Sequence, residues 1–182
     1  MILSDKIINE YINTGKIIIF PEFDEKNIRP AGIRLHLGLG ILIPQANQTV
    51  DIGSSDDAIF DEKVIGNDGY ILKPGEFILG STYESFQVPR DIVCHIESRS
   101  TVARLGIAIH CTSSIIDGNY EEPRTVVLEI KNQGPFSLVL KYKMALAMLF
   151  FSELTTDIKQ SVQKQYKGQN GTVPPNLKLQ KE

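Results

Sequence analysis

The residues best suited to chemistry gather in one stretch, which runs from Ser98 to Glu129. It opens with two arginines and two hydroxyl side chains in a short segment, namely Arg99, Ser100, Thr101 and Arg104. Guanidinium and hydroxyl groups bind phosphate well, and a helix that begins here would add free backbone N–H groups. The segment therefore favours a phosphate-binding turn, with a solvated loop held by an arginine ion pair as the alternative.

Two acids follow in the same stretch. Asp117 opens the turn-like sequence Asp117-Gly-Asn-Tyr120, where it could accept from a sugar hydroxyl while Tyr120 packs under the sugar. The alternative is a turn aspartate that bonds its own backbone. Glu129 interrupts the apolar run 125–130, and on an alternating strand it would point away from its apolar neighbours. A glutamate against a core needs a partner or a function, whereas a solvent-facing one needs neither.

The triplet His95-Ile96-Glu97 resembles the H-x-E half of zinc-dependent nucleobase deaminases. Those sites also need P-C-x-x-C, and the two cysteines of this chain, Cys94 and Cys111, are isolated. We therefore expect no zinc and no metal held by the protein's own side chains.

The length, net charge and cysteine count of the chain limit the classes of function that it can have. A chain of 182 residues suits one domain. A net charge of −3 excludes bulk attraction to nucleic acid, and two cysteines do not make a disulfide framework. The longest strongly apolar run, 144–151, is far below the roughly 20 residues that a membrane helix needs, and the N-terminus lacks a signal peptide. We expect a cytoplasmic protein that binds neither membrane nor nucleic acid.

The elements that must position these residues are mostly strands. Ser4 can cap a helix over Asp5–Thr14, which Gly15 would end, and a strand over Lys16–Phe20 follows. From Pro30 onward, short apolar or β-branched runs alternate with turn residues. We predict strands at 33–37, 40–43, 70–72, 77–81, 92–96, 106–110, 125–131, 136–140 and 145–150. This spacing indicates an all-β sandwich or barrel.

The composition changes near residue 156, where Gln, Lys, Gly, Asn and Pro become dominant. We therefore divide the chain into a β domain with its N-terminal helix (1–155) and a flexible C-terminal segment of the same domain (156–182). The sequence around Tyr166, Lys167 and Gln169 would suit a lid over a bound anion, and an ordinary disordered terminus is the alternative.

Five motifs together resemble the family of trimeric dCTP deaminases and dUTPases. The most specific is Ser98-Arg-Ser-Thr-Val-Ala-Arg-Leu-Gly106, which is similar to the family's GRSSLARLG. The segments 110–117, 127–134 and 166–171 resemble HVTAHRID, VLEFYNSG and YQGQxG, and the helix with Pro30-Ala-Gly-Ile-Arg-Leu-His-Leu-Gly38 resembles the deaminase N-terminus. Arg34 stands where the family usually has an acid, and Ile115 where it usually has an arginine.

The resemblance implies a mainly β fold, a distorted β-barrel or jelly roll with a short N-terminal helix, that forms homotrimers with active sites between subunits. It implies magnesium bound through the substrate triphosphate, and no zinc. It also implies a catalytic set and a nucleotide-binding set. The first is Glu129 as general acid/base, with Arg104 and Ser100. The second is Arg99, Ser100, Thr101, Arg104, Ser113, Asp117, Tyr120, Val127, Glu129, Tyr166, Lys167 and Gln169.

Within the second set, the resemblance assigns Arg99, Ser100 and Thr101 to the phosphates, partly from a neighbouring subunit. Asp117 would bind the deoxyribose 3′-hydroxyl and Val127 would read the base edge. Ser113 would bond the attacking water, and Gln169 would close the lid on the phosphates.

The function implied is deamination of dCTP to dUTP and ammonia in deoxypyrimidine nucleotide biosynthesis. An extension to dUMP and pyrophosphate stays open, and dTTP is a candidate inhibitor. The alternative enzyme is a dUTPase of the same fold, in which Asp117 has the larger catalytic role. A second alternative is a nucleotide-binding regulatory homologue with weakened catalysis, which the residues Arg34 and Ile115 motivate.

Overall fold

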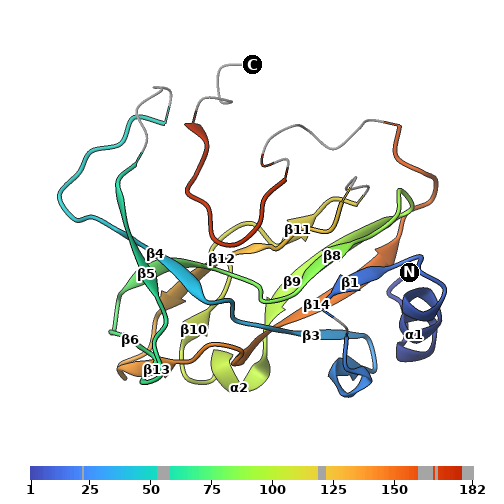
Figure 1. Cartoon of the computed structure of the whole chain (residues 1–182), viewed down its shortest axis with the longest axis horizontal. Coiled ribbons are helices and arrows are strands. Elements are labelled where there is room, and N and C mark those ends of the chain that lie inside the picture. The colour runs from blue at the N-terminus through green and yellow to red at the C-terminus, as the bar shows by residue number, and fades with distance from the viewer. Residues whose placement is uncertain (22, 53–57, 119–121, 160–165, 167, 178–182) are drawn as a thin grey trace.

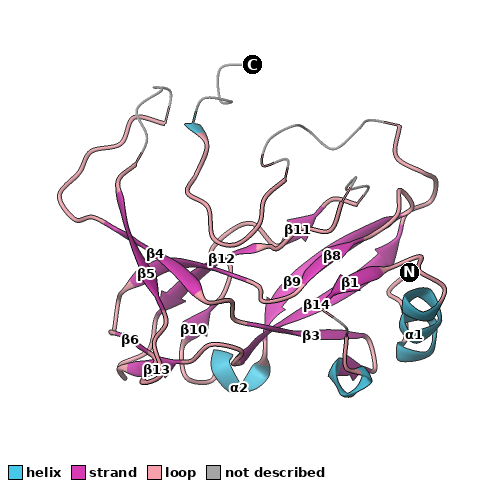
Figure 2. Cartoon of the chain, in the orientation of Figure 1, coloured by secondary structure: helices cyan, strands magenta, loops and turns pink. Residues whose placement is uncertain are grey.

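A computed structural model describes residues 1–21, 23–52, 58–118, 122–159, 166 and 168–177. Strands and turns dominate these residues (Figure 2). One antiparallel sheet has the order β10 (Ile107–Ala108), β12 (Val127–Asn132), β7 (Phe77–Ser81), β4 (Gly40–Pro44), β5 (Phe60–Val64). We call it the β12 sheet.

A second antiparallel sheet has the order β11 (Ile115–Ile116), β9 (Ile92–Ser98), β14 (Ala145–Glu153), β3 (Gly32–His36), β2 (Ile28–Arg29), and we call it the β14 sheet. Two short ribbons pair β1 (Ile18–Phe20) with β8 (Ser85–Gln87) and β13 (Leu138–Leu140) with β6 (Tyr70–Leu72). The helices are α1 (Asp5–Asn13), the 3₁₀ turn η1 (Glu25–Asn27) and α2 (Ser100–Ala103) (Figure 1).

The two large sheets share one hydrophobic core. Alternate residues of each strand point inward, as the period of two requires. Ile33 and Leu149 of the β14 sheet and Ile78 and Ile130 of the β12 sheet are fully buried in the same cluster. Each side chain of this size contributes about 1.5–3 kcal/mol when it is removed from water, so the contact between the sheets is the main source of stability.

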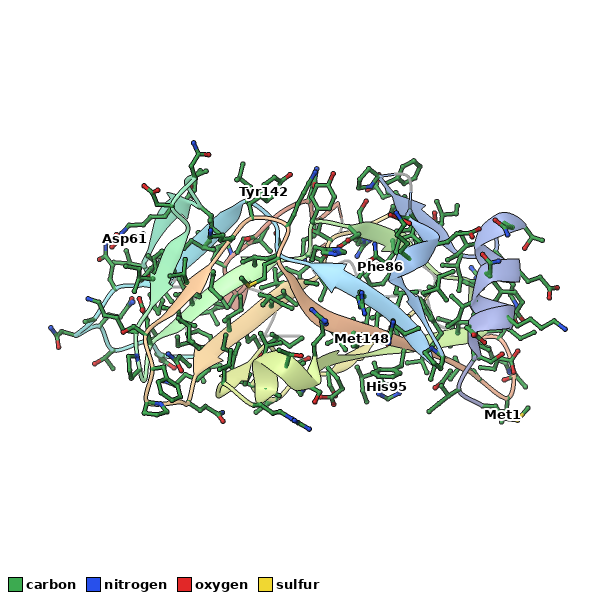
Figure 3. The ribbon with its side chains drawn as sticks, turned by 90° about the horizontal axis from the view of Figure 1, so that it is seen from below. Met1, Asp61, Phe86, His95, Tyr142 and Met148 are labelled. Atoms are coloured by element: carbon green, nitrogen blue, oxygen red, sulfur yellow. The ribbon has the colours of Figure 1, made fainter. Side chains whose placement is uncertain are left out.

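The expectation of a mainly β fold is confirmed. Of the two forms expected, a distorted β-barrel or a jelly roll, the described sheets do not close into a barrel. The β12 sheet ends at β10 and β5, and the β14 sheet ends at β11 and β2. Among the described residues these four strands each pair on one side only. The edge strand β5 carries Asp61, Glu62 and Lys63 in exposed positions, and such charged edges resist further pairing. Asp61 and Met1 lie at opposite ends of the molecule (Figure 3).

The N-terminal helix forms where the sequence predicts it. Ile8 is buried, Tyr11 and Ile12 pack against the core, and Gly15 adopts φ +74° beyond the helix end. The proposed cap is wrong in one respect. Ser4 occupies the N-cap position, but its hydroxyl makes no capping hydrogen bond. No helix among the described residues has the length and apolar character needed to cross a membrane.

Asn132, at the end of β12, ties three backbone segments together. Its side-chain amide donates to Leu72 O at 3.1 Å and to Phe136 O at 2.7 Å, and its side-chain oxygen accepts from Gly134 N at 3.0 Å. Asn132 is fully buried, so these backbone groups have no water to replace a lost partner.

We predict that Asn132→Ala lowers the free energy of unfolding by at least about 2 kcal/mol, because it leaves buried backbone groups unpaired. Urea denaturation followed by circular dichroism measures the change. The control is Asn67→Ala in an exposed turn, which should stay within about 0.5 kcal/mol of the unaltered protein. An equal effect of both substitutions would contradict the role of the Asn132 network.

Candidate active site

Glu129 lies on the outer face of the β12 sheet. Its neighbours Leu128 and Ile130 point into the core, so Val127, Glu129 and Lys131 share the opposite face. Its cross-strand partner is Leu79 of β7, whose own partner is Leu42 of β4. The prediction that Glu129 points away from its apolar neighbours is confirmed, and the side chain is half-buried.

Two backbone N–H groups hold the Glu129 carboxylate. Cys111 N donates to Oε2 at 2.8 Å, and Thr112 N approaches the same oxygen at 3.4 Å. The chain can reach Glu129 because β10 pairs antiparallel with β12, with Ala108 opposite Lys131, so the segment that leaves β10 continues toward the level of Glu129. Oε1 accepts none of the hydrogen bonds found among the described residues, which leaves it available to a ligand.

The Cys111 thiol lies close enough to Glu129 for the carboxylate charge to change the pKa of the thiol. Its Sγ lies 3.5 Å from Glu129 O. Burial raises the pKa of Cys111, the negative charge of Glu129 raises it further, and the positive charge of Lys131 opposes both. The thiol therefore stays protonated to higher pH than a free cysteine.

The segment predicted to bind phosphate forms the short helix α2, and its phosphate binding stays a prediction. Arg99 is its N-cap, and Ser100 and Thr101 are exposed in its first positions. Gly106 follows with φ +88°, and a Cβ there would lie 2.4 Å from Gly134 N, so only glycine fits. Arg104 is exposed at the C-cap and takes part in none of the ion pairs between described residues. Its place beside Glu129 in the catalytic set stays a prediction.

Arg99 belongs to the β14 sheet rather than to the sheet of Glu129. Its backbone N–H donates to Leu146 O at 3.0 Å, and its Nη1 donates to Ala145 O at 2.9 Å. Both acceptors belong to or adjoin β14. Arg99 and Glu129 are thus attached to different sheets.

The remaining predicted residues lie in three places. Ser113 is exposed in the same segment as Cys111, and Asp117 is exposed directly after β11. Val127 is half-buried on the face of Glu129, with Ser81 as its cross-strand partner. Tyr120 and Lys167 lie outside the described residues.

The C-terminal segment folds back onto β12. The hydroxyl of Thr125 accepts from Gly171 N at 2.9 Å and lies 3.2 Å from Gly171 O, while Gln169 Nε2 donates to Thr125 O at 3.0 Å. The Thr172 hydroxyl donates to Gly40 O at 2.7 Å. Figure 1 shows this red segment descending onto the middle of the molecule. The predicted lid residue Gln169 is therefore bonded to Thr125, which lies four positions before Glu129 in the chain.

The low exposure of three leucines supports the conclusion that the C-terminal segment lies over the outer face of the β12 sheet. Leu42 and Leu79, which share a face with Glu129, are 5% and 7% exposed, although they lie outside the main core cluster. Leu177, in the C-terminal segment, is 7% exposed and also lies outside that cluster. The segment that includes Thr172 and Leu177 thus covers part of the outer face of the β12 sheet.

Sequence reasoning missed several residues that shape this site. Thr125 anchors the C-terminal segment, and its hydroxyl carried no signal among many threonines. The N–H groups of Cys111 and Thr112 belong to the backbone, so no residue type in the sequence marks them. Elsewhere in the fold, sequence reasoning also missed Glu84, which is 4% exposed, accepts from His36 N at 2.8 Å and contacts the His36 ring through its carboxylate.

The H-x-E triplet does not converge on a metal. Cys94 is buried in the core, whereas His95 and Glu97 point to the opposite face of β9. Glu97 Oε2 lies 3.1 Å from His110 Nε2. Among the described residues no three His, Cys, Asp or Glu side chains form a group that could hold a metal ion.

We predict that Thr125→Val frees the C-terminal segment, because the substitution keeps the shape but removes the hydroxyl that bonds Gly171. Cleavage after Lys159 or Lys164 by trypsin should become faster, and amide exchange at Gly171 should rise. Thr49→Val, in an exposed loop, is the matched control. Unchanged cleavage and exchange would mean that Thr125 does not hold the segment.

We predict that Cys111 reacts with iodoacetamide more slowly at pH 8 than a free thiol, because only the thiolate reacts and the pKa of Cys111 is raised. Glu129→Gln removes a negative charge, lowers that pKa and should speed the reaction. Lys131→Gln removes the opposing positive charge and should slow it. Mass spectrometry of the alkylated peptide measures both, and equal rates in the two variants would refute the proximity of these charges.

The sequence matches known proteins along nearly its whole length. Residues 2–154 match the family model described as dCTP deaminase-like. The dCTP deaminase of Haloarcula marismortui is 35% identical over 99% of this chain and 95% of its own. A protein of Methanosphaera stadtmanae named dCTP deaminase, dUMP-forming, is 32% identical over 97% of this chain and 94% of its own.

Solved structures support the same fold. The 2′-deoxycytidine 5′-triphosphate deaminase of Agrobacterium tumefaciens superimposes with a TM-score of 0.64 at 22% identity, over 82% of this chain and 47% of its own. The EIAV dUTPase superimposes with a TM-score of 0.50 at 17% identity, over 81% of this chain and 97% of its own. The chain belongs to the dCTP deaminase-like family.

Proposed function

We propose that this protein is a dCTP deaminase, which converts dCTP and water to dUTP and ammonia and so supplies deoxypyrimidine nucleotide biosynthesis. One observation carries the proposal. Glu129, a half-buried carboxylate, is fixed through one oxygen by the backbone of residues 111 and 112, while the other oxygen is left for a ligand. The names of the relatives that match nearly the whole chain support the same substrate.

In this mechanism Glu129 moves the protons. Its Oε1 takes a proton from a water molecule, whose oxygen attacks C4 of the cytosine. The carboxyl group passes this proton to the ring nitrogen N3. It then takes the proton of the new hydroxyl group on C4 and passes it to the amine, so that the C4–N bond breaks, ammonia leaves and C4 becomes a carbonyl carbon. The N–H groups of Cys111 and Thr112 keep the carboxylate in place throughout. Ser113, two residues from Cys111, bonds the attacking water.

The nucleotide is held by segments around this carboxylate. Val127 shares a face with Glu129 and, with its adjoining backbone, contacts the base edge. Asp117 bonds the 3′-hydroxyl and Tyr120 packs under the sugar. Gln169, which reaches Thr125 O from the C-terminal segment, closes that segment over the phosphates together with Tyr166 and Lys167.

The phosphates are held by Arg99, Ser100 and Thr101 of a neighbouring copy in a homotrimer. The attachment of Arg99 to the β14 sheet and of Glu129 to the β12 sheet supports this arrangement, because one chain holds the two groups on separate layers. Exposed apolar residues on the β14 sheet, such as Ile115 at 61%, suit burial between copies. Light scattering, read against 20.3 kDa for one chain, checks the assembly.

Magnesium arrives with the triphosphate and takes its ligands from phosphate oxygens and water, as it does in many nucleotide enzymes. The ion neutralises phosphate charge, and the chemistry at C4 depends on Glu129 and needs no zinc. dTTP acts as an inhibitor because it offers the same sugar and triphosphate without the leaving amine. The enzyme works in the cytoplasm.

A bifunctional reaction is the second candidate, in which water also cleaves dUTP to dUMP and pyrophosphate. The relative named dCTP deaminase, dUMP-forming, favours it. A plain dUTPase would give Asp117 the larger catalytic role. A nucleotide-binding regulatory homologue would bind dCTP without turnover.

Product analysis separates these functions. Purified protein receives dCTP or dUTP with magnesium, and chromatography follows the base and the phosphates. dUTP from dCTP alone supports the deaminase, and dUMP from both supports the bifunctional enzyme. dUMP from dUTP alone would make the protein a dUTPase, and binding without any product would make it a regulatory homologue.

We predict that Glu129→Gln lowers kcat for deamination by about 10²–10⁴-fold, because the amide cannot accept a proton from water. dCTP binding, measured by calorimetry, should change little. The control is Glu62→Gln on the exposed edge strand β5. Turnover close to that of the unaltered enzyme would remove Glu129 from the mechanism.

A further inference from the structure

Two arginines project from the outer face of the β14 sheet. Arg34 lies between Ile33 and Leu35, which are buried in the core, so it points outward. Its cross-strand partner is Met148, which is labelled in Figure 3. Arg29 of β2 is the partner of Gly32, two residues before Arg34, and cross-strand partners share a face. Arg29 and Arg34 therefore extend from the same side of neighbouring strands.

Arg99 reaches the same region from β9. Its guanidinium is fixed by the bond from Nη1 to Ala145 O at 2.9 Å, and its backbone by the bond to Leu146 O. β14 lies between β9 and β3, so this anchoring holds Arg99 against the strand that neighbours Arg34. A guanidinium has five N–H donors, and the bond to Ala145 uses one of them.

The three guanidinium groups have no acidic partner among the described residues. The ion pairs there are Lys16–Asp91, Lys26–Asp24, His36–Glu84 and His110–Glu97. The acid nearest in the ladder is Glu97, the other partner of Met148, and it is paired with His110. Burial lowers the pKa of Arg99, and the positive charges of Arg34 and Arg29 lower it further, so the groups lie close enough to repel one another.

Like charges held together in this way favour a ligand of opposite sign. Guanidinium groups are planar, weakly hydrated and shaped to bind phosphate oxygens in pairs. Arg29 and Arg34 come from the neighbouring strands β2 and β3, and Arg99 directly follows β9, on the other side of β14. Neighbouring strands lie about 4.8 Å apart, so the three groups form an extended array. A small monovalent anion would contact only part of such an array, whereas a chain of linked phosphates would contact all of it.

We propose that Arg29, Arg34 and Arg99 form a binding site for a linear polyphosphate chain. Arg99 belongs to the phosphate-binding turn already described, and Arg29 and Arg34 extend that turn across the sheet. The chain is either the triphosphate of the nucleotide or a free inorganic polyphosphate. The first source rests on the proposed function, whereas binding of a free polyphosphate does not.

The test measures binding of sodium tripolyphosphate, at constant ionic strength and without nucleotide, by calorimetry and by the midpoint of thermal unfolding. Arg34→Gln should weaken binding by about 10- to 100-fold, the usual effect of losing a charge-assisted contact. Without ligand, the same variant should unfold at a higher temperature than the unaltered protein, because the repulsion is relieved. Weaker binding together with a higher unfolding temperature in the absence of ligand is expected only where cations that repel one another form the binding site.

Two further variants complete the design. Arg29→Gln, at an exposed position, should weaken binding in the same direction and covers the case in which Arg34→Gln fails to fold. Lys63→Gln on β5 removes the same charge from the other sheet and should leave tripolyphosphate affinity unchanged. Unchanged affinity in both arginine variants, or an equal loss in Lys63→Gln, would overturn the proposal.

Kinetics then separate the two sources. If the site holds the nucleotide's triphosphate, tripolyphosphate competes with dCTP and raises KM alone, and Arg34→Gln raises KM for dCTP. If the site holds a separate polyphosphate, tripolyphosphate binds at saturating dCTP and changes kcat. If the protein turned over neither nucleotide, the proposed function would be refuted. Calorimetry with tripolyphosphate would still show whether the three arginines form a binding site.

Discussion

The alternation of β12 constrains everything else in the site. Leu128 and Ile130 must face the core, and because the period of a strand is two, Glu129 must then face outward with Val127 and Lys131. A slip of one residue would drive the Glu129 charge into the apolar layer and expose two large apolar side chains. The pairing of five successive β12 residues with β7 fixes the register. Core packing thus determines where the Glu129 carboxylate lies.

Around that strand the site is built by segments that are distant in sequence. The backbone of residues 111 and 112 reaches Glu129 because β10 is hydrogen-bonded to β12, and Gln169 reaches Thr125 because the chain returns after β14. Few of these contacts involve the large core, so these segments are stabilised mainly by a small number of hydrogen bonds. Such segments open more readily than the sheets beneath them, which would suit the proposed function, in which the site admits a nucleotide and releases its product.

Much of this could be predicted from sequence where a pattern is local. The helix 5–13, the strands β6 and β7, the turn at Gly106 and the outward direction of Glu129 follow from periodicity and turn residues. The strand β5 could not, because Phe60-Asp-Glu-Lys-Val64 has an edge strand's charges and no alternating apolar signal. The open sheets, the Thr125 contact and the arginine cluster depend on pairing between distant strands, which no short window contains.

The separation of charge between the two sheets has a physical advantage. Had one chain placed Arg99 beside Glu129, the two side chains would pair, and neither would be free for a ligand. Instead the Glu129 carboxylate is held by neutral backbone N–H groups, and the Arg99 guanidinium is fixed by the carbonyl group of Ala145 in the other sheet. In the proposed function each group stays available to the substrate. A nucleotide that carries a base at one end and phosphates at the other would then bridge the two groups when copies of the chain meet.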